Sequence, residues 1–393
     1  MKKSLIALAA LAATGAFAQS TVSIDGQFDV GMQSLAYKGA PTINGFAGNG
    51  STTSQINFRG TQDFGGGLKA EFRVETDWNT ASNNGNTGAA AAWGSAAATA
   101  ATVTPAPAGA GVPALAAASS FGNGEIRGGL TSTTFGRIDI GAINNGQLDA
   151  YLTGQNFGTA FGSSFRGLVI NDTSAANGVR FDNSLRYQTP SFNGVSVSVL
   201  NVQKQTAAAN TATGNASTFG ALGAYDYMGV NEVSLRYNNG PINAIYTATK
   251  QDYNNVQTAF AGTLGNYTTE LDSFGANYTM GDWKFFLFNQ KRTKSDNSVN
   301  RNYTSASVAY TMGANRFNVQ LGQGKDTGTS GNGKNSTLTS VGYDYDLSKT
   351  TSLYARYENT KDDGGWVANA ATLAAVSGNN TRTRTAVGLR IGF

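Results

Sequence analysis

Residues 57–75 read NFRGTQDFGGGLKAEFRVE, and this stretch decides the fold. Every second residue from Leu68 to Val74 is apolar, and the residues between them are charged. A period of two is typical of a β-strand with one apolar and one polar face. The glycine-rich segment at 63–66 interrupts the pattern and indicates a tight turn, because glycine adopts the backbone angles that such turns need. The stretch therefore predicts a β-hairpin.

The same alternation recurs along the chain and closes at the last residue, Phe393. The breaks between the alternating segments are of two lengths. Tight turns are expected at 63–66, 132–134, 190–193, 239–241, 281–282, 313–315 and 347–350. Longer loops are expected at 34–52, 79–122, 144–178, 205–230, 252–270, 294–302, 326–335 and 362–381. This spacing predicts about sixteen antiparallel strands, with short turns at one rim and long loops at the other, as in an outer-membrane β-barrel.

A closed barrel explains this pattern better than a soluble β-sandwich does. A sandwich also alternates, but about sixteen strands without a linker are unusual for one sandwich domain. A bilayer admits only helices or closed sheets, because it offers no water to unpaired backbone groups. Aromatic residues are expected at segment ends, where they would form interfacial girdles. These residues are Trp78, Phe135, Trp283, Tyr310, Tyr345, Tyr357 and Phe393.

The composition excludes several classes of function. Charged residues make up 13% of the chain, about half the usual ~25%. The chain has no cysteine and no histidine, which removes thiolate chemistry, the commonest general base and the commonest metal ligand. The net charge of +4 is too small and too dispersed for a nucleic-acid footprint. We therefore expect no enzyme, no cofactor, no metal and no nucleic-acid partner.

The first eighteen residues have the pattern of an export signal. Lys2 and Lys3 precede an apolar run from Leu5 to Phe17, and the A-x-A sequence at 16–18 suits cleavage. The apolar run is too short for a transmembrane helix. The sequence predicts that residues 1–18 are a cleaved signal peptide. Residues 19–393 then form a single barrel domain, exported by a Gram-negative bacterium.

Several strings resemble the Gram-negative general porins, most closely those of beta-proteobacteria. The hairpin 57–75 is one, and the terminal RTRTAVGLRIGF at 382–393 is another. Three more are FGNGEIRGGLTSTTFGRIDIGA at 121–142, VRFDNSLRYQTP at 179–190 and TLTSVGYDYDLSKTTSLYARYE at 337–358. The resemblance departs at Gln55 and at Gly141-Ala142, positions near which the family often carries arginine.

This resemblance implies a homotrimer of sixteen-stranded, water-filled barrels in the outer membrane. It implies contact with membrane lipid and lipopolysaccharide. The terminal aromatic, Phe393, would be the signal that the barrel-assembly machinery reads. The third long loop, at 144–178, would fold into the pore and constrict it. Its charged residues are Asp149, Arg166 and Asp172.

Alternation also assigns the faces of the strands. If Phe58 and Val74 face lipid, Arg59 and Arg73 face the lumen. An arginine facing lipid at mid-depth would cost about 2–4 kcal/mol, so this assignment is a real constraint. The candidates for a basic wall at the constriction are Arg59, Arg73, Arg127, Arg180, Arg186 and Arg382. Carboxylates expected in the lumen are Asp25, Asp29, Asp77, Asp139, Asp344 and Glu358.

Two readings of these arginines stay open. As fixed charges they would attract anions, which predicts a weakly anion-selective channel for small hydrophilic solutes and inorganic ions. Alternatively, they pair with neighbouring acids and only stiffen the wall; those acids would be Glu71, Glu75, Glu125, Asp182 and Glu232. Competing functions are a substrate-specific channel and a surface adhesin or antigen barrel.

Overall fold

The computed structural model describes residues 20–38, 41–78, 80, 124–163, 179–203, 228–253, 257–258, 262–263, 267–329, 334–363 and 381–393. The predicted signal peptide at 1–18 lies outside these residues, as do Arg166 and Asp172. Within the described ranges, no helix is long and apolar enough to cross a bilayer.

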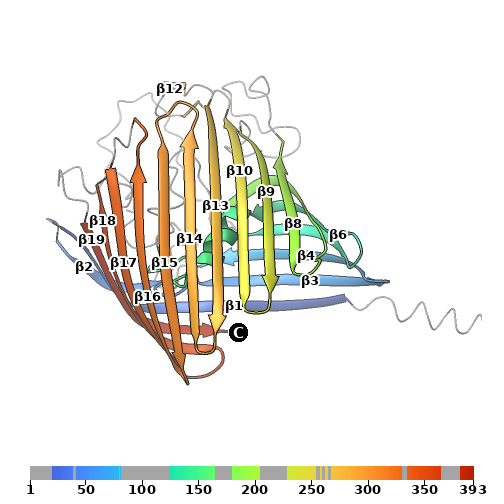
Figure 1. Ribbon diagram of the computed structural model, residues 1–393. Coiled ribbons are helices and arrows are strands. Elements are labelled where there is room, and N and C mark those ends of the chain that lie inside the picture. Colours follow the sequence, from blue (N-terminus) through green and yellow to red (C-terminus); the bar gives the residue numbers. More distant parts are fainter. Residues whose placement is uncertain are drawn as a thin grey trace, which may run out of the picture.

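The strands form one antiparallel sheet that closes into a barrel (Figure 1). Closure is made by β1, whose residues 27–37 pair with residues 382–392 of the last strand, β19. The first half of the wall consists of β1 (Ser20–Tyr37), β2 (Ile43–Gly48), β3 (Gln55–Gly65), β4 (Leu68–Asp77), β5 (Ile126–Ser132), β6 (Gly136–Asn144), β7 (Arg180–Gln188), β8 (Val195–Val202) and β9 (Met228–Asn239). The second half consists of β10 (Ile242–Tyr253), β13 (Tyr267–Met280), β14 (Trp283–Lys294), β15 (Asn300–Met312), β16 (Asn315–Asp326), β17 (Lys334–Asp346), β18 (Thr351–Asp362) and β19 (Thr381–Gly392). A separate two-stranded ribbon joins β11 (Gln257–Thr258) to β12 (Gly262–Thr263).

Two of the strands share one position in the wall. The sheet contains 17 strands, but β2 pairs with residues 30–35 of β1 and β3 pairs with residues 20–27 of the same strand. The barrel therefore has sixteen positions, as the sequence predicted. The expected long loop at 34–52 was too long, because β1 runs to Tyr37 and β2 occupies 43–48.

The short connections lie where the sequence placed them, with small shifts. The first tight turn is at Gly66–Gly67 rather than 63–66, because a register shift between Asp63 and Gly65 lets β3 continue further. Both turn glycines have positive φ, 61° and 80°, which a residue with a side chain rarely adopts. Backbone hydrogen bonds join Gly26 to Phe393 at this turn end of the barrel, which brings β1 and the end of β19 together.

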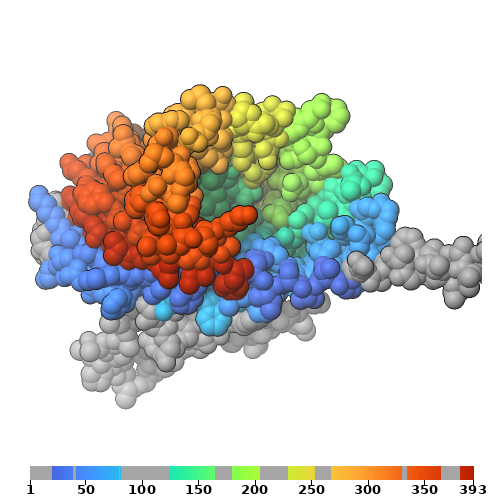
Figure 2. All heavy atoms as spheres, turned by 90° about the horizontal axis from the view of Figure 1, so that it is seen from below, coloured from blue at the N-terminus to red at the C-terminus, as the bar shows by residue number. Residues whose placement is uncertain are grey.

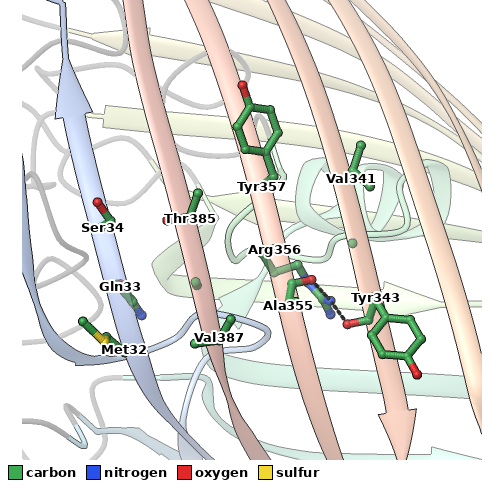
Figure 3. A pocket seen from close by; sticks show the side chains of 12 residues that line it. Met32, Gln33, Ser34, Val341, Tyr343, Ala355, Arg356, Tyr357, Thr385 and Val387 are labelled. Carbon is green, nitrogen blue, oxygen red and sulfur yellow. Dashed lines mark hydrogen bonds between the residues drawn. The ribbon is translucent and has the colours of Figure 1, made fainter.

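The outer face of the barrel is apolar, as strand alternation requires. Val22, Ile24 and Met32 on β1 and Phe285 and Leu287 on β14 are exposed in the isolated chain. On the outer surface, a shallow groove is lined by outward-facing residues of β1, β17, β18 and β19 (Figure 3), including Met32, Val341, Tyr343, Ala355, Tyr357 and Val387. This is the surface that a bilayer would cover.

Aromatic side chains gather near the turn end. The Trp283 and Tyr310 rings are 4.4 Å apart between centroids, and the Phe317 and Tyr343 rings are 5.3 Å apart. The expectation for Tyr357 was wrong, because this residue lies in the middle of β18 rather than at its end. It faces outward in the apolar band.

Inside the barrel lies the helix α2 (Gly146–Gly154), which follows β6. Seen from below in Figure 2, the ring of strands is hollow, and the green segment that contains α2 stands within it. The third long loop therefore folds into the barrel, as predicted, for its described part up to Ser163.

Candidate pore constriction

The wall strands β9, β10 and β13–β19 have 12–14 residues and form the tall side of the barrel, whereas β5–β8 have 7–9 and form the low side. The inward segment, residues 145–163, is fixed to the luminal face of the tall side. Asn145 caps α2, because its Oδ1 accepts a hydrogen bond from the Leu148 N–H at 3.0 Å. The Gly146 N–H donates to Glu232 Oε1 on β9 at 2.6 Å. Gln147 donates to Thr249 Oγ1 at 2.7 Å. The first turn of α2 is thus held by β9 and β10.

The rest of the segment continues around the wall. Asn277 on β13 donates to the Thr153 carbonyl at 2.8 Å, and Asn156 donates to the Val308 carbonyl on β15 at 3.0 Å. The helix backbone touches β13 directly, since a Cβ at Gly275 would overlap the Ala150 carbonyl oxygen. These contacts cover part of the luminal face of β9, β10, β13 and β15 and leave β3–β7 facing the lumen.

Three predicted wall arginines form one row across adjacent strands. Arg59 on β3 is the register partner of Arg73 on β4, and Arg73 is the register partner of Arg127 on β5. The next position in the row is Gly141 on β6. A Cβ there would overlap the Ile126 carbonyl oxygen, and its φ of 146° is rare for other residues, so the row ends at a glycine.

Like charges directly opposite one another in a sheet are destabilising, so the row requires counter-charges. Arg59 Nε lies 2.5 Å from Asp25 Oδ2. Arg73 lies 2.6 Å from Glu75 and 2.7 Å from Glu125, measured between nitrogen and oxygen atoms. Arg127 bonds to Glu125 and Asp139.

Asp139 is the centre of a second group of arginines. Its carboxylate lies 2.9 Å from Arg127 Nη1, 2.7 Å from Arg137 Nε and 2.8 Å from Arg186 Nη2. Arg180 lies 3.9 Å from Asp77, and it reaches this group through Asn144, which accepts hydrogen bonds from both Arg180 and Arg186. The arginines on β3–β7 are therefore interspersed with the carboxylates of the same wall that bind them. We call this set the arginine wall; its basic members are Arg59, Arg73, Arg127, Arg137, Arg180 and Arg186.

Most wall arginines are more exposed to the lumen than the acids they bind. The Arg137 and Arg186 side chains are 23% and 17% exposed, whereas Asp139 is 1% exposed. Arg73 is likewise more exposed than Glu75 and Glu125. On the luminal side the guanidinium groups therefore stand in front of the carboxylates, although the wall is nearly neutral in total.

Arg382 does not belong to this wall. It lies on β19, where it and Arg384 both bind Glu358, which is fully buried. Glu358 also accepts the Gly162 N–H of the inward segment at 3.0 Å. The Arg384 guanidinium lies 4.1 Å from the centre of the Phe161 ring, a cation–π contact. This group holds the tip of the inward segment, and we call it the tip anchor.

Arg356 extends the tip anchor on β18. It bonds to Asp344 at 2.6 Å and to the Tyr343 carbonyl at 3.0 Å (Figure 3). Its guanidinium lies 5.7 Å from the centre of the Phe157 ring. The side chain is thus engaged by the wall and by the inward segment at once.

Among the predicted loop residues, the structure describes Asp149. Its carboxylate bonds to Arg236 on β9 at 3.0 Å, and both side chains are partly exposed to the lumen. Arg166 and Asp172 lie outside the described residues. The described part of the inward segment has no other charged residue than Asp149.

Sequence reasoning anticipated part of the pairing of these charges. It listed Glu71, Glu75 and Glu125 as acids that could pair with arginines, and all three do. It also listed Glu232, which instead binds the backbone of the inward segment. It gave Arg137 no role at the constriction, although this arginine lies two residues from Asp139 on the same face of β6 and bonds to it. No group of three acidic residues in the described part of the chain is placed to hold a metal ion.

The fold and the lumen define a class of protein: a closed β-barrel with an apolar outer band, a polar interior and a loop folded inside it. The family model for Gram-negative porins matches residues 4–365. The chain therefore belongs to the Gram-negative porin family. Proteins of this family are outer-membrane channels, and this membership, together with the apolar outer band, places the chain in the outer membrane.

Similar proteins agree with this assignment. An outer membrane porin protein of Bordetella pertussis is 27% identical over 397 residues, covering 90% of this chain and 93% of that protein. Outer membrane porin protein 32 of Delftia acidovorans is 28% identical over 412 residues, covering both chains fully. An anion-selective porin from Comamonas acidovorans has a similar fold, with a TM-score of 0.66 and 20% identity over 95% of this chain and 100% of that one. A trimer form of OmpT from Vibrio cholerae has a TM-score of 0.59 and 12% identity, over 95% of this chain and 99% of that one.

Proposed function

We propose that the chain forms a water-filled channel for the passive diffusion of small hydrophilic solutes and inorganic ions, with a weak preference for anions. One observation carries the preference: wall carboxylates such as Asp139 are buried beneath the arginines that bind them. Guanidinium groups stay charged at any accessible pH and so attract anions permanently. The similar porin that is described as anion-selective supports the same sign.

The preference should be weak because carboxylates nearly balance the wall. The most exposed wall pair, Arg59 and Asp25, presents both charges almost equally, at 39% and 42% exposure. The described part of the inward segment adds one acid, Asp149, which is itself paired with Arg236. Discrimination then depends on pore width and on the charges nearest the axis.

Planar-bilayer recording tests both parts of the proposal. We expect large, non-saturating single-channel currents. In a KCl gradient, the sign of the zero-current potential should show that chloride permeates more readily than potassium. Absence of open channels would favour a surface adhesin or antigen barrel. Conductance that saturates with one solute would favour a substrate-specific channel, and a clear cation-selective sign would refute the anion preference.

We propose a homotrimer as the assembled form. The strands β5–β8 have 7–9 residues, whereas β9–β19 in the wall have 12–14. A tilted strand needs about 9–11 residues to cross a bilayer, so the low side suits contact with neighbouring subunits better than contact with lipid. Light scattering of the detergent-solubilised protein should give three times the mass of the chain, and a monomer mass would contradict this.

We propose that lipopolysaccharide contacts the outer face of the tall side, above the apolar band. Exposed lysines stand there near the loop ends of four strands: Lys250, Lys291, Lys325 and Lys361. Ammonium groups bind phosphate as point charges, and lipopolysaccharide carries phosphate at this level. Added lipopolysaccharide should raise the unfolding temperature of the wild type more than that of a variant with these four lysines changed to glutamine.

We also propose that residues 1–18 are removed on export and that Phe393 is recognised by the barrel-assembly machinery. The Phe393 side chain is exposed at the turn end, directly after β19. Phe393→Ala should lower the amount of folded protein in the outer membrane without changing the currents of the channels that form. Unchanged assembly would contradict this role.

A further inference from the structure

The chain leaves the wall between β2 and β3 and crosses the luminal face of β1. We call residues 49–54 the β2–β3 loop. Asn49 opens it with a φ of 63°, and its Oδ1 accepts the Ser54 N–H at 2.8 Å, which closes the loop on itself. The loop contains no charged residue.

One buried carboxylate holds this loop. Asp29 on β1 is 0% exposed. It accepts hydrogen bonds from three consecutive backbone N–H groups, those of Gly50 at 3.2 Å, Ser51 at 2.7 Å and Thr52 at 2.8 Å. The Tyr354 hydroxyl on β18 donates a fourth at 2.7 Å. Hydrogen bonds to an ionised acceptor are the strong ones, and three successive N–H groups form an anion-binding concavity.

The surrounding packing is built for this arrangement. A Cβ at Gly31, Gly50 or Gly388 would overlap the Tyr354 hydroxyl oxygen. These glycines come from β1, from the β2–β3 loop and from β19. Three separate parts of the chain therefore leave room for one hydroxyl group, which in turn reaches Asp29.

The β2–β3 loop also touches the inward segment. Thr53 Oγ1 lies 3.1 Å from Thr159 Oγ1, in a hydrogen bond between the two elements. Arg356, which contacts the Phe157 ring, donates to Ser51 Oγ at 3.1 Å. The loop thus stands in the lumen between the wall and the tip of the inward segment.

We propose that the β2–β3 loop is a second constricting element of the pore, and that Asp29 is the positioning residue that holds it. This inference rests on the proposed function as a water-filled channel. Because the loop is uncharged, it narrows the pore without favouring either ion. Asp29 therefore sets the width of the pore, whereas the arginine wall sets its selectivity.

Two variants test this inference, each compared with the wild type. Asp29→Ala removes all four hydrogen bonds to the carboxylate, and Tyr354→Phe removes one hydroxyl while keeping the ring. Single-channel conductance and the swelling of liposomes in sugars of increasing size are measured. We expect a larger conductance and entry of a sugar that the wild type excludes. Tyr354→Phe changes no charge, so it should also keep the zero-current potential of the wild type. If Asp29→Ala does not fold, the conductance and sugar limit of Tyr354→Phe alone test the inference. Wild-type conductance and exclusion in the variants that fold would overturn the inference.

Asp25→Asn is the matched control. Asp25 lies on the same strand and the same face as Asp29, but it is partly exposed and pairs with Arg59. This variant should shift the zero-current potential and leave the sugar limit unchanged. If the wild-type protein forms no channels, the proposed function is refuted. If the wild type forms channels but the Asp29 and Tyr354 variants keep its conductance and its sugar limit, only this inference is refuted.

Discussion

Arginine is used in two ways in this barrel. On β3–β7 the guanidinium groups cover carboxylates of their own wall and face the lumen, as Arg137 and Arg186 cover Asp139. On β18 and β19 they bind Glu358 and Asp344 and lie against the Phe157 and Phe161 rings of the inward segment. We propose that the same residue type controls ion preference in the arginine wall and loop position in the tip anchor.

The largest expected effect comes from breaking the tip anchor. Glu358→Gln leaves the buried Arg384 and the mostly buried Arg382 without their shared carboxylate. Removing one partner of a buried ion pair costs about 3–5 kcal/mol, so the barrel should unfold at a lower temperature. The shift of electrophoretic mobility on heating measures this. The noise of the open-channel current should also rise, because the Gly162 N–H then bonds to a neutral amide oxygen instead of a carboxylate.

Asp346→Asn is the control for this variant, because Asp346 and its partner Arg316, 3.7 Å away, are both partly exposed. Exposed pairs contribute about 0–1 kcal/mol, so little change is expected. Equal stability of the Glu358 and Asp346 variants would contradict the role of the tip anchor.

The next effect concerns selectivity. Asp139→Asn is nearly isosteric but leaves Arg127, Arg137 and Arg186 with one carboxylate fewer. The zero-current potential in a KCl gradient should move toward the value for an ideal chloride channel. Asp63 pairs with Lys69 at the turn end, and Asp63→Asn should shift the potential less than Asp139→Asn does. An unchanged potential in the Asp139 variant would mean that this wall does not control selectivity.

The smallest effect is expected outside the lumen. In the connection after β14, the Ser298 hydroxyl and backbone N–H donate to Asp296 and hold the pKa of its carboxyl below the usual value. These bonds raise the free energy of unfolding at pH values above the usual aspartate pKa. That stabilisation is lost as the pH falls through the lowered pKa of Asp296. Asp296→Ala should leave the zero-current potential unchanged at neutral pH, and a shift would show that this connection reaches the ion path.

The sequence predicted which residues of a strand face the lumen better than it predicted which residues lie beside them on neighbouring strands. Period-two alternation placed Arg59, Arg73 and Arg127 in the lumen, because slipping a strand by one residue would turn a charge toward lipid. It could not place these three residues in one row, because the register of β5 depends on a connection of more than forty residues after β4. It also could not show that Arg382 serves the tip anchor, since its partners belong to β18 and the inward segment.

The β2–β3 loop shows a similar limit. The sequence joined 34–52 into one loop, because short polar residues and glycines conceal the strand β2. The function of Asp29 depends on backbone N–H groups that follow it by more than twenty residues, which no side-chain pattern reveals.

One pair of measurements tests most directly whether the two groups of arginines differ. Arg59→Gln and Arg382→Gln each remove one guanidinium charge that faces one carboxylate, Asp25 or Glu358. Their zero-current potentials are compared with the wild type in the same KCl gradient. We predict that Arg59→Gln weakens the chloride preference and that Arg382→Gln leaves it unchanged. An equal or larger shift in the Arg382 variant would contradict the division between arginine wall and tip anchor.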